Sequence, residues 1–252
     1  MAYDTSPHMP NPPTRKPRAW LSWSSGKDSA WTLHMLRTRG DVDVVGLLTT
    51  LNREAGRVAM HAVREALLDA QAAGAGLPLI KISLPHPCSN AAYEDAMRDA
   101  IARAKADGIT HMAFGDLFLQ DVRQYREQML AGTGIQPMFP LWGQPTGPLA
   151  NRMIAAGLRA YLTCVDPKQL PPTFAGRTFD EWLLKDLPDG VDPCGERGEF
   201  HTFAYTGPMF KEPVAILPGE IVTRDGFVFA DLRLDQRSTN RPTGPLRRRT
   251  AP

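Results

Sequence analysis

The first half of the chain alternates short apolar runs with stretches in which apolar residues recur every three or four positions. The short runs predict strands, and the recurring stretches predict amphipathic helices. Strands are expected at 19–23, 42–48, 79–82 and 110–114, and helices at 30–39, 60–73, 91–105 and 119–130. This alternation indicates right-handed crossovers, and therefore an α/β fold whose parallel sheet carries helices on both faces.

The pattern changes at about residue 132, where Pro and Gly become frequent. A helix is expected at 149–157, a strand at 159–165 and a helix at 179–187. We interpret this half as a second, smaller α/β domain that covers the crevice of the first and supplies the substrate pocket. The expected segments are a disordered tail (1–18), the first domain (19–131), the second domain (132–235) and another disordered tail (236–252), the tails being rich in Pro and basic residues.

The segment Ser24-Ser25-Gly26-Lys27-Asp28-Ser29 joins the first expected strand to the first helix. Such a junction can bind an anion, because the first N–H groups of a helix lack intrahelical partners and carry the positive end of the helix dipole. The serines can add hydroxyl donors, and Lys27 adds a point charge. Taken alone, the six residues fit an ordinary Ser-capped helix start equally well.

The segment differs from the common phosphate loop, which has Gly five residues before its Gly-Lys pair and Ser or Thr directly after it. Leu21 and Asp28 occupy those two positions. It resembles instead the PP-loop of the ATP pyrophosphatases, Ser-Gly-Gly-Xaa-Asp-Ser, with Ser25 in place of the first Gly. That resemblance implies cleavage of ATP between the α- and β-phosphates and adenylation of a substrate oxygen. If the loop requires a positive φ at position 25, Ser25 introduces strain that Gly would avoid.

Two further polar segments are candidates for the same site. Gly115-Asp116 follows the expected strand at 110–114, and ligands of parallel sheets bind at the carboxyl ends of the strands. The segment 193–202 gathers two glycines, two carboxylates, an Arg and a His. This composition suits a binding loop, and it suits a solvated hairpin equally well.

The segment Cys194-Gly195-Glu196-Arg197-Gly198-Glu199-Phe200 is similar to the Cys-Gly-Glu-Gly-Gly-Glu-Tyr/Phe loop of the diphthine–ammonia ligase family, except at Arg197. Pro140-Leu141-Trp142 and Gly115-Asp116 also match motifs of that family. The resemblance runs from about Ala19 to Phe229 and favours the bacterial branch. It implies a fold of the PP-loop, adenine nucleotide alpha hydrolase type and an AMP-forming, ATP-dependent amide ligase. The family's eukaryotic and archaeal ligase amidates diphthine, a modified histidine of elongation factor 2; bacteria make no diphthamide, so the acceptor here is unknown.

The resemblance also implies roles for individual residues. ATP is expected at Ser24, Ser25, Gly26, Lys27, Asp28, Ser29, Thr49, Thr50 and Gly115, with the adenine beside the backbone of the two threonines. The acceptor and ammonium are expected at Trp142, Cys194, Gly195, Glu196, Gly198, Glu199 and His201. Catalytic roles are expected for Lys27, Asp28, Asp116, Glu196 and Glu199.

Several of these roles have alternatives. Asp28 would help to bind Mg²⁺ or would brace the loop. Trp142 would stack on the substrate or pack the domain junction. His201 stands where the family usually has Glu. Arg123, Tyr125 and Arg126 would guard the acceptor pocket or belong to a solvated helix face.

Composition narrows the remaining choices. The 252 residues carry a net charge of only +2, so the chain has no basic field that would favour nucleic acid. It has no apolar run of about 18 residues and no secretory signal, so we expect a cytoplasmic protein without a membrane partner. The cysteines Cys88, Cys164 and Cys194 lack a CxxC spacing and predict neither a disulfide framework nor a zinc site.

The expected partners are ATP, ammonium or an amine, and a carboxylate acceptor, and the sequence allows a homodimer. Two other functions remain open. A PP-loop enzyme of tRNA modification would need a basic face or a catalytic cysteine pair. A non-catalytic adenine-nucleotide-binding regulator would fit the replacement of two glycines by Ser25 and Arg197.

Overall fold

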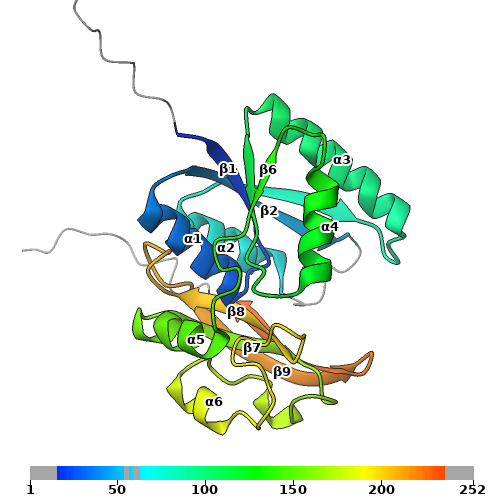
Figure 1. The fold of residues 1–252 in the computed structure, drawn as a ribbon. Coiled ribbons are helices and arrows are strands. Elements are labelled where there is room, and N and C mark those ends of the chain that lie inside the picture. Colours follow the sequence, from blue (N-terminus) through cyan, green and yellow to red (C-terminus); the bar gives the residue numbers. More distant parts are fainter. Residues whose placement is uncertain (1–15, 54–56, 59–62, 236–252) are drawn as a thin grey trace, which may run out of the picture.

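The computed structural model describes residues 16–53, 57–58 and 63–235. Its first layer is a parallel sheet of five strands in the order β4-β2-β1-β5-β6, with β3 (Arg57–Val58) pairing antiparallel to the end of β2 (Figure 1). The strands of the parallel sheet are β1 Arg18–Ser22, β2 Asp43–Asn52, β4 Leu79–Leu84, β5 His111–Ala113 and β6 Gln136–Met138.

Helices cover both faces of this sheet, as the sequence predicted (Figure 1). The helices are α1 Lys27–Arg39, α2 Glu65–Ala75, α3 Asn90–Ala106 and α4 Gln120–Leu130. Successive side chains of a strand point to opposite faces. Leu21 and Trp23 accordingly join the buried cluster that contains Leu33 and Leu67, whereas Trp20 joins a separate cluster with Met97 of α3.

The second layer is an antiparallel sheet of four strands in the order β8-β7-β10-β9. Its strands are β7 Arg159–Val165, β8 Phe200–Thr206, β9 Ile216–Arg224 and β10 Phe227–Leu234; α5 (Thr146–Ala155), the short η1 (Pro172–Phe174) and α6 (Glu181–Asp186) accompany them. Asp225 and Gly226, with φ of 52° and 82°, turn the chain between β9 and β10. Two residues with positive φ are what a tight hairpin turn requires.

The two sheets share one buried cluster, so they form one continuous core. Trp23 meets Phe210 edge to face, with ring centroids 6.4 Å apart. The buried Gln71 of α2 connects both layers: its Oε1 accepts from Trp23 Nε1 at 2.9 Å, and its Nε2 donates to the carbonyl of Ser25 at 2.9 Å and to that of Ala204 at 2.6 Å. The second layer is therefore fixed to the loop that begins α1.

Several details differ from the sequence predictions. The expected strand at 42–48 continues to Asn52, so Thr49 and Thr50 lie inside β2 and not after it. The expected helix at 60–73 begins at Glu65 and ends at Ala75, and residues 60–62 of that prediction lie outside the described residues. The strands β6, β8, β9 and β10 were not predicted.

The domain boundaries and the tails stay predictions. Residues 1–15 and 236–252 lie outside the described part of the chain, whereas Arg18 opens β1. Beyond the expected boundary at 131/132, β6 still belongs to the first sheet, where it pairs with β5. Among the described residues, none of the helices has both the length and the apolar character needed to cross a bilayer.

Candidate active site

A pocket of about 300 Å³ opens where β1, α1, β5 and the 193–202 segment meet. Many of the residues predicted for the site line it: Ser24, Lys27, Asp28, Ser29, Gly115, Asp116, Cys194, Gly195, Glu196, Gly198 and His201. The other residues that line the pocket include Ser22, Leu119, Val122, Arg126 and Thr202. The fold thus brings residues from both layers into a single pocket at the carboxyl ends of β1 and β5.

The loop between β1 and α1 is held by its own serines. Ser24 and Ser29 have their hydroxyl oxygens 3.2 Å apart, and the Ser29 hydroxyl donates to the Gly26 carbonyl at 3.0 Å. Gly26, the N-cap of α1, has no side chain to cap the first amides of the helix. A helix start without a side-chain cap, at the edge of a pocket, suits an anion.

Ser25 adopts the left-handed backbone conformation, with φ of 71°. The loop therefore requires the positive φ that would make a Gly favourable here. Ser25 is fully buried, and its hydroxyl has no hydrogen-bond partner within the described structure. Arg197, the other residue that replaces a family Gly, is not among the described residues with positive φ, which are Ser25 and Asp225 apart from glycines.

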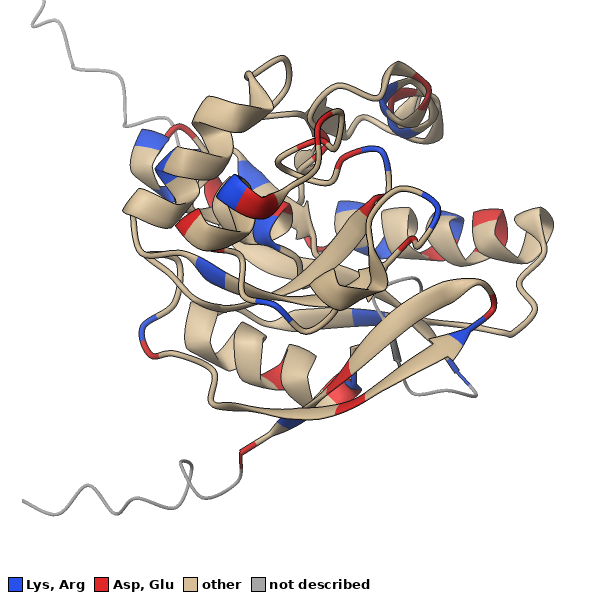
Figure 2. Cartoon of the chain, turned by 90° about the horizontal axis from the view of Figure 1, so that it is seen from below, with Lys and Arg blue, Asp and Glu red and all other residues tan. Residues whose placement is uncertain are grey.

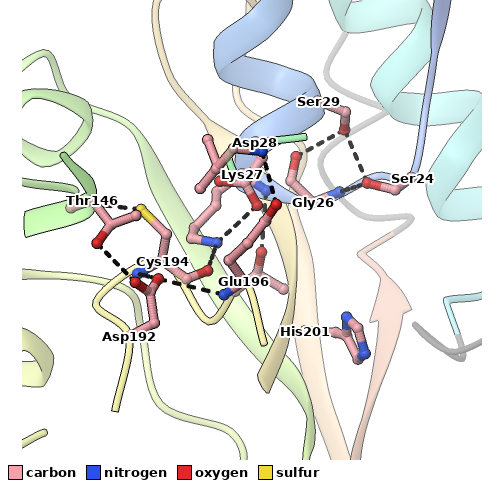
Figure 3. A network of polar contacts seen from close by, with 12 residues as sticks. Ser24, Gly26, Lys27, Asp28, Ser29, Thr146, Asp192, Cys194, Glu196 and His201 are labelled. Carbon is pink, nitrogen blue, oxygen red and sulfur yellow. Dashed lines mark hydrogen bonds and ion pairs between the residues drawn. The ribbon is translucent and has the colours of Figure 1, made fainter. Parts of the chain in front are cut away.

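Lys27 is buried between the two layers, as Figure 3 shows. Its ammonium contacts Asp28 Oδ2 at 2.9 Å and donates to the Cys194 carbonyl, and it lies 5.3 Å from the ring centroid of Phe200. Burial opposes the charged form, yet the neighbouring carboxylate of Asp28, assisted by that of Glu196, outweighs it and raises the pKa of Lys27. Lys27 therefore stays a cation in the pocket wall.

Asp28 and Asp116 each offer an oxygen with no hydrogen-bond partner, Oδ1 and Oδ2 respectively, although both atoms are buried. Burial raises the pKa of Asp28, against the opposing effect of Lys27. Burial likewise raises the pKa of Asp116. The charge of Arg126, whose Nε is 3.8 Å from Asp116 Oδ2, opposes this effect. Two buried, unpartnered carboxylate oxygens are suitable donors for a hard cation such as Mg²⁺.

The 193–199 loop is organised by Asp192, which the sequence analysis did not place in the site. Asp192 Oδ1 accepts from the Cys194 amide at 2.8 Å, and Oδ2 accepts from the Thr146 hydroxyl at 2.7 Å (Figure 3). An Asp directly before a Pro and two residues before a buried turn is the local signal that could have identified this role. The contact with Thr146 could not be found in this way, because 46 residues separate the pair.

Glu196 projects from this loop into the pocket, where its Oε1 accepts from the Leu117 amide at 2.7 Å. Burial is the main cause that raises the pKa of Glu196 to about 7, and the Asp28 carboxylate adds to it against the opposing Leu117 hydrogen bond. A carboxyl group that titrates near neutral pH can either hold a cation or accept a proton. Glu196 is thus suited to acid–base chemistry in this pocket.

Glu199 occupies a different position from Glu196. It is buried and does not line the pocket; its Oε1 accepts from the Asp192 amide at 2.9 Å and its Oε2 from the Arg197 amide at 2.9 Å. Both oxygens thus brace the loop. Of the two predicted glutamates, Glu196 lines the pocket, whereas Glu199 has structural contacts.

Thr202 and Arg126 add groups that the sequence analysis did not assign to the site or left open. The Thr202 hydroxyl accepts from the Lys27 amide at 3.1 Å, so β8 fixes the start of α1. Arg126 lines the pocket with its guanidinium 5.1 Å from the ring centroid of Phe114. Of the two alternatives for Arg126, the structure therefore favours the pocket over a solvated helix face.

His201 also lines the pocket, on β8 to one side of the polar network (Figure 3). Burial, followed by the charge of Lys27, lowers the pKa of His201 to about 4. The imidazole is therefore neutral near pH 7. It can contribute a ring nitrogen to hydrogen bonding there, but no positive charge.

Six predicted residues are absent from the pocket lining: Ser25, Gly26, Thr49, Thr50, Trp142 and Glu199. Thr49 and Thr50 pair with Lys81 and Ile82 of β4, and the Thr49 hydroxyl is buried without a partner within the described structure. The Trp142 ring meets that of Phe139 edge to face, with centroids 6.0 Å apart, and it lies 4.7 Å from the guanidinium of Arg123 in α4. These contacts favour the packing alternative for Trp142.

The parallel sheet with helices on both faces, together with the small-residue loop that begins α1, defines an α/β protein of the PP-loop type. Family models identify the group more closely: residues 18–137 match the diphthamide synthase N-terminal domain, and residues 146–232 match the diphthamide synthase C-terminal domain. The chain belongs to the diphthamide synthase family. This confirms the family resemblance that its motifs indicated.

Curated relatives agree with this assignment. The chain is 34% identical over 118 residues to a diphthine–ammonia ligase of Danio rerio and 30% identical over 118 residues to that of Homo sapiens. These alignments cover 44% of this chain and 46% and 44% of the two relatives. The diphthine–ammonia ligase of Schizosaccharomyces pombe is 28% identical over 100 residues, which cover 38% of this chain and 16% of that protein. The chain thus matches less than half the length of these relatives.

Proposed function

We propose that the protein is an ATP-dependent amide ligase that resembles diphthine–ammonia ligase. In this proposal it adenylates a carboxylate and releases pyrophosphate; ammonia then attacks the activated carbonyl, the bond to AMP breaks, and the amide and AMP are released. The observation that carries it is the convergence of Lys27, from the helix start of the first layer, with Glu196, from the second layer, in one pocket. The names of the curated relatives support the same reaction.

The first half-reaction would use the loop that begins α1. The first amides of α1, the hydroxyls of Ser24 and Ser29 and the ammonium of Lys27 would hold the phosphates and stabilise the charge that develops on the departing pyrophosphate. Lys27 is already held in place by Asp28 and by the carbonyl of Cys194. Because its partners fix it before substrate arrives, its position costs little reorganisation during the reaction.

The pocket also fits Mg²⁺, which we propose as a cofactor. Asp28 Oδ1 and Asp116 Oδ2, both buried and without a hydrogen-bond partner, would hold the ion together with phosphate oxygens. Mg²⁺ bound there would neutralise part of the phosphate charge. For the adenine we retain the backbone near Thr49 and Thr50, since the amide of Trp23 donates to the carbonyl of Leu48 at 2.7 Å and so keeps this part of β2 next to the start of the loop.

The second half-reaction would use Glu196. Its carboxylate would capture ammonium and accept a proton from it, because only the neutral amine carries the electron pair that attacks the activated carbonyl. Arg126, which also lines the pocket, would hold the acceptor through an oxygen. The acceptor is a carboxylate that this pocket can admit, and we propose no name for it.

Cys164 and Cys194 do not supply the catalytic pair that the tRNA-modification alternative needs. Cys164 and Cys194 are both buried, and burial raises the pKa of Cys164 to about 12. Burial also raises the pKa of Cys194, against the opposing charge of Lys27. Thiols of this kind are poor nucleophiles because the thiolate is the reactive form.

The proposal is tested by incubating the protein with ATP, Mg²⁺, ammonium and a small-molecule extract, and by measuring AMP and pyrophosphate. The wild type should release both. Lys27→Ala should reduce pyrophosphate release by about 100-fold or more, because it removes the charge closest to the loop. Asp116→Asn should reduce it too, whereas Lys81→Ala, which removes a lysine paired with Glu65 and Asp69 away from the pocket, serves as the matched control.

Two results would contradict the proposal. An unchanged rate in the folded Lys27→Ala protein would refute the assignment of ATP to this pocket. Binding of ATP by the wild type without release of AMP, whichever extract is used, would favour the non-catalytic regulator.

A further inference from the structure

The strand β9 is an edge of the second sheet and is open on both faces. Residues 220–224 are all exposed. Five large apolar side chains are exposed in the described part of the chain, and three of them belong to β9: Leu217 (47% exposed), Ile221 (57%) and Val222 (44%). Apolar edge strands of this kind are templates for pairing with another strand, and proteins generally cover or charge them.

The charges of β9 make it complementary to itself. Glu220, Val222 and Arg224 alternate along the strand, so their side chains share one face, and all three line the same shallow hollow beside Phe229. In an antiparallel pair of two β9 strands, a two-fold axis through Val222 places each Glu220 opposite the Arg224 of the other copy. Acidic and basic residues are interspersed over the ribbon in Figure 2, and β9 itself carries Glu220 and Arg224.

The pairing segment has natural limits. Pro218, which has no N–H to contribute to a ladder, marks one end, and the Asp225-Gly226 turn marks the other. Within the described part of the chain, Arg224 pairs with the exposed Asp225 at 3.6 Å and contacts the Phe229 ring at 4.9 Å. Its side chain is exposed, so a carboxylate of another chain can reach it.

We propose that a second copy of this chain pairs with β9, antiparallel and about an axis through Val222, to form a homodimer with one continuous eight-stranded sheet. Such an interface is isologous, since each copy contributes the same surface. It joins two Val222 side chains at the axis and flanks them with two Glu220–Arg224 pairs. The proposal is independent of the proposed reaction, because β9 contributes no residue to the lining of the active-site pocket.

The test is the molar mass in solution, measured by light scattering on a sizing column over a range of protein concentrations. The wild type should be a dimer. Glu220→Arg sets two arginines opposite each other at each end of the segment, and Arg224→Glu sets two glutamates there, so each variant alone should be a monomer. An equimolar mixture of these two variants should form a dimer again, because every cross-axis pair then joins opposite charges.

Two controls keep the test specific. Glu94→Arg and Arg98→Glu make the same charge changes on the exposed side of α3, which lies far from β9 in Figure 1, and should leave the dimer intact. Val222→Lys sets a lysine of each copy at the axis, so this variant should be a monomer. Mixing it with either charge variant should not restore the dimer. A monomeric wild type, dimeric single charge variants or a monomeric mixture would each overturn this interface.

Discussion

At the level of single residues, Ser25 combines two unfavourable features in the centre of the loop. Its φ of 71° places a side chain in a backbone region that costs an L-residue about 1–2 kcal/mol. Its hydroxyl is also buried without a partner among the described residues. Strain of this kind is typical of sites where function requires a backbone shape that folding alone would not select.

Ser25→Gly is therefore expected to raise the free energy of unfolding by about 1–2 kcal/mol, since relief of strain and removal of the buried hydroxyl exceed the entropy that Gly adds to the unfolded chain. Urea unfolding measures this change. Asp225→Gly is the matched control: Asp225 has φ of 52° but is exposed, so its gain should be smaller. If Ser25→Gly stabilises the protein no more than the control does, or destabilises it, the positive φ and the buried hydroxyl of Ser25 do not have the stated cost.

Glu196 links stability to pH. Its pKa rises from 4.5 in the unfolded chain to about 7 in the folded protein, mainly through burial. Between these values the folded state binds more protons than the unfolded state, so stability falls as the pH rises through this window. The full effect is at most about 3 kcal/mol, from 1.36 kcal/mol per pKa unit.

Glu196→Gln should remove this fall in stability with rising pH, because a Gln side chain has no charge to bury. Compared with the wild type, the variant should gain about 2–3 kcal/mol of relative stability between pH 5 and pH 8, as measured by urea unfolding at each pH. A constant difference between the two proteins across that range would show that Glu196 does not titrate there.

Between elements, a close backbone approach at the site joins Gly115, after β5, to the start of α1. A methyl group on Gly115 would lie 3.1 Å from the carbonyl carbon of Asp28 and 3.1 Å from the amide nitrogen of Ser29. These are backbone atoms that cannot rotate away. The absence of a side chain at this position thus allows the strand end to contact the helix start directly.

Gly115→Ala should displace the start of α1, lower the affinity for ATP by about tenfold or more and cost about 1–3 kcal/mol of stability. Calorimetric titration with ATP and urea unfolding measure the two effects. Gly147→Ala, in α5, is the control, because no atom lies within 4 Å of its added methyl group. Equal affinities for the two variants would show that the contact does not shape the loop.

The elements that the sequence predicted best are those with a clear period. The β1–α1 loop could be located because strand, small residues and helix follow one another directly. The β9–β10 hairpin was missed although Asp225-Gly226 lies between two β-rich runs, which is a recognised hairpin signal. The three-residue β6, which contains Pro137, offers too short a pattern to be recognised.

The site could be predicted only where its residues form motifs. Glu196 and Lys27 stand in recognisable segments, whereas the role of Thr202 depends on a contact with the amide of Lys27 across 175 positions of the chain. Glu199 shows that a motif alone can also mislead. The motif predicted the same role for Glu199 as for Glu196, but the carboxylate of Glu196 points into the pocket, whereas that of Glu199 accepts hydrogen bonds within the loop.

In the molecule as a whole, Gln71 is the polar group that connects the two layers. Its amide reaches Trp23, Ser25 and Ala204, all in a buried region. Gln71→Leu should lower the free energy of unfolding by about 2–4 kcal/mol, because the indole N–H of Trp23 and the carbonyl of Ala204 lose their partner while they remain buried.

Thermal and urea unfolding, followed both by tryptophan fluorescence and by circular dichroism, measure this change and show whether the two layers still unfold together. Gln124→Leu, on the exposed side of α4, makes the same chemical change without a buried partner and should have little effect. A Gln71→Leu protein as stable as this control would contradict the role of Gln71.

The loop that begins α1 is shaped by both halves of the chain. The carbonyl of Ser25 accepts a hydrogen bond from the amide of Ala204, and the amide of Lys27 donates one to the hydroxyl of Thr202. A gene that joined the N-terminal half of one family member to the C-terminal half of another would therefore encode a loop that contacts a β8 strand from a different protein. We expect recombination at this boundary to fail more often than recombination within either half, and the residues on its two sides to have changed together during evolution.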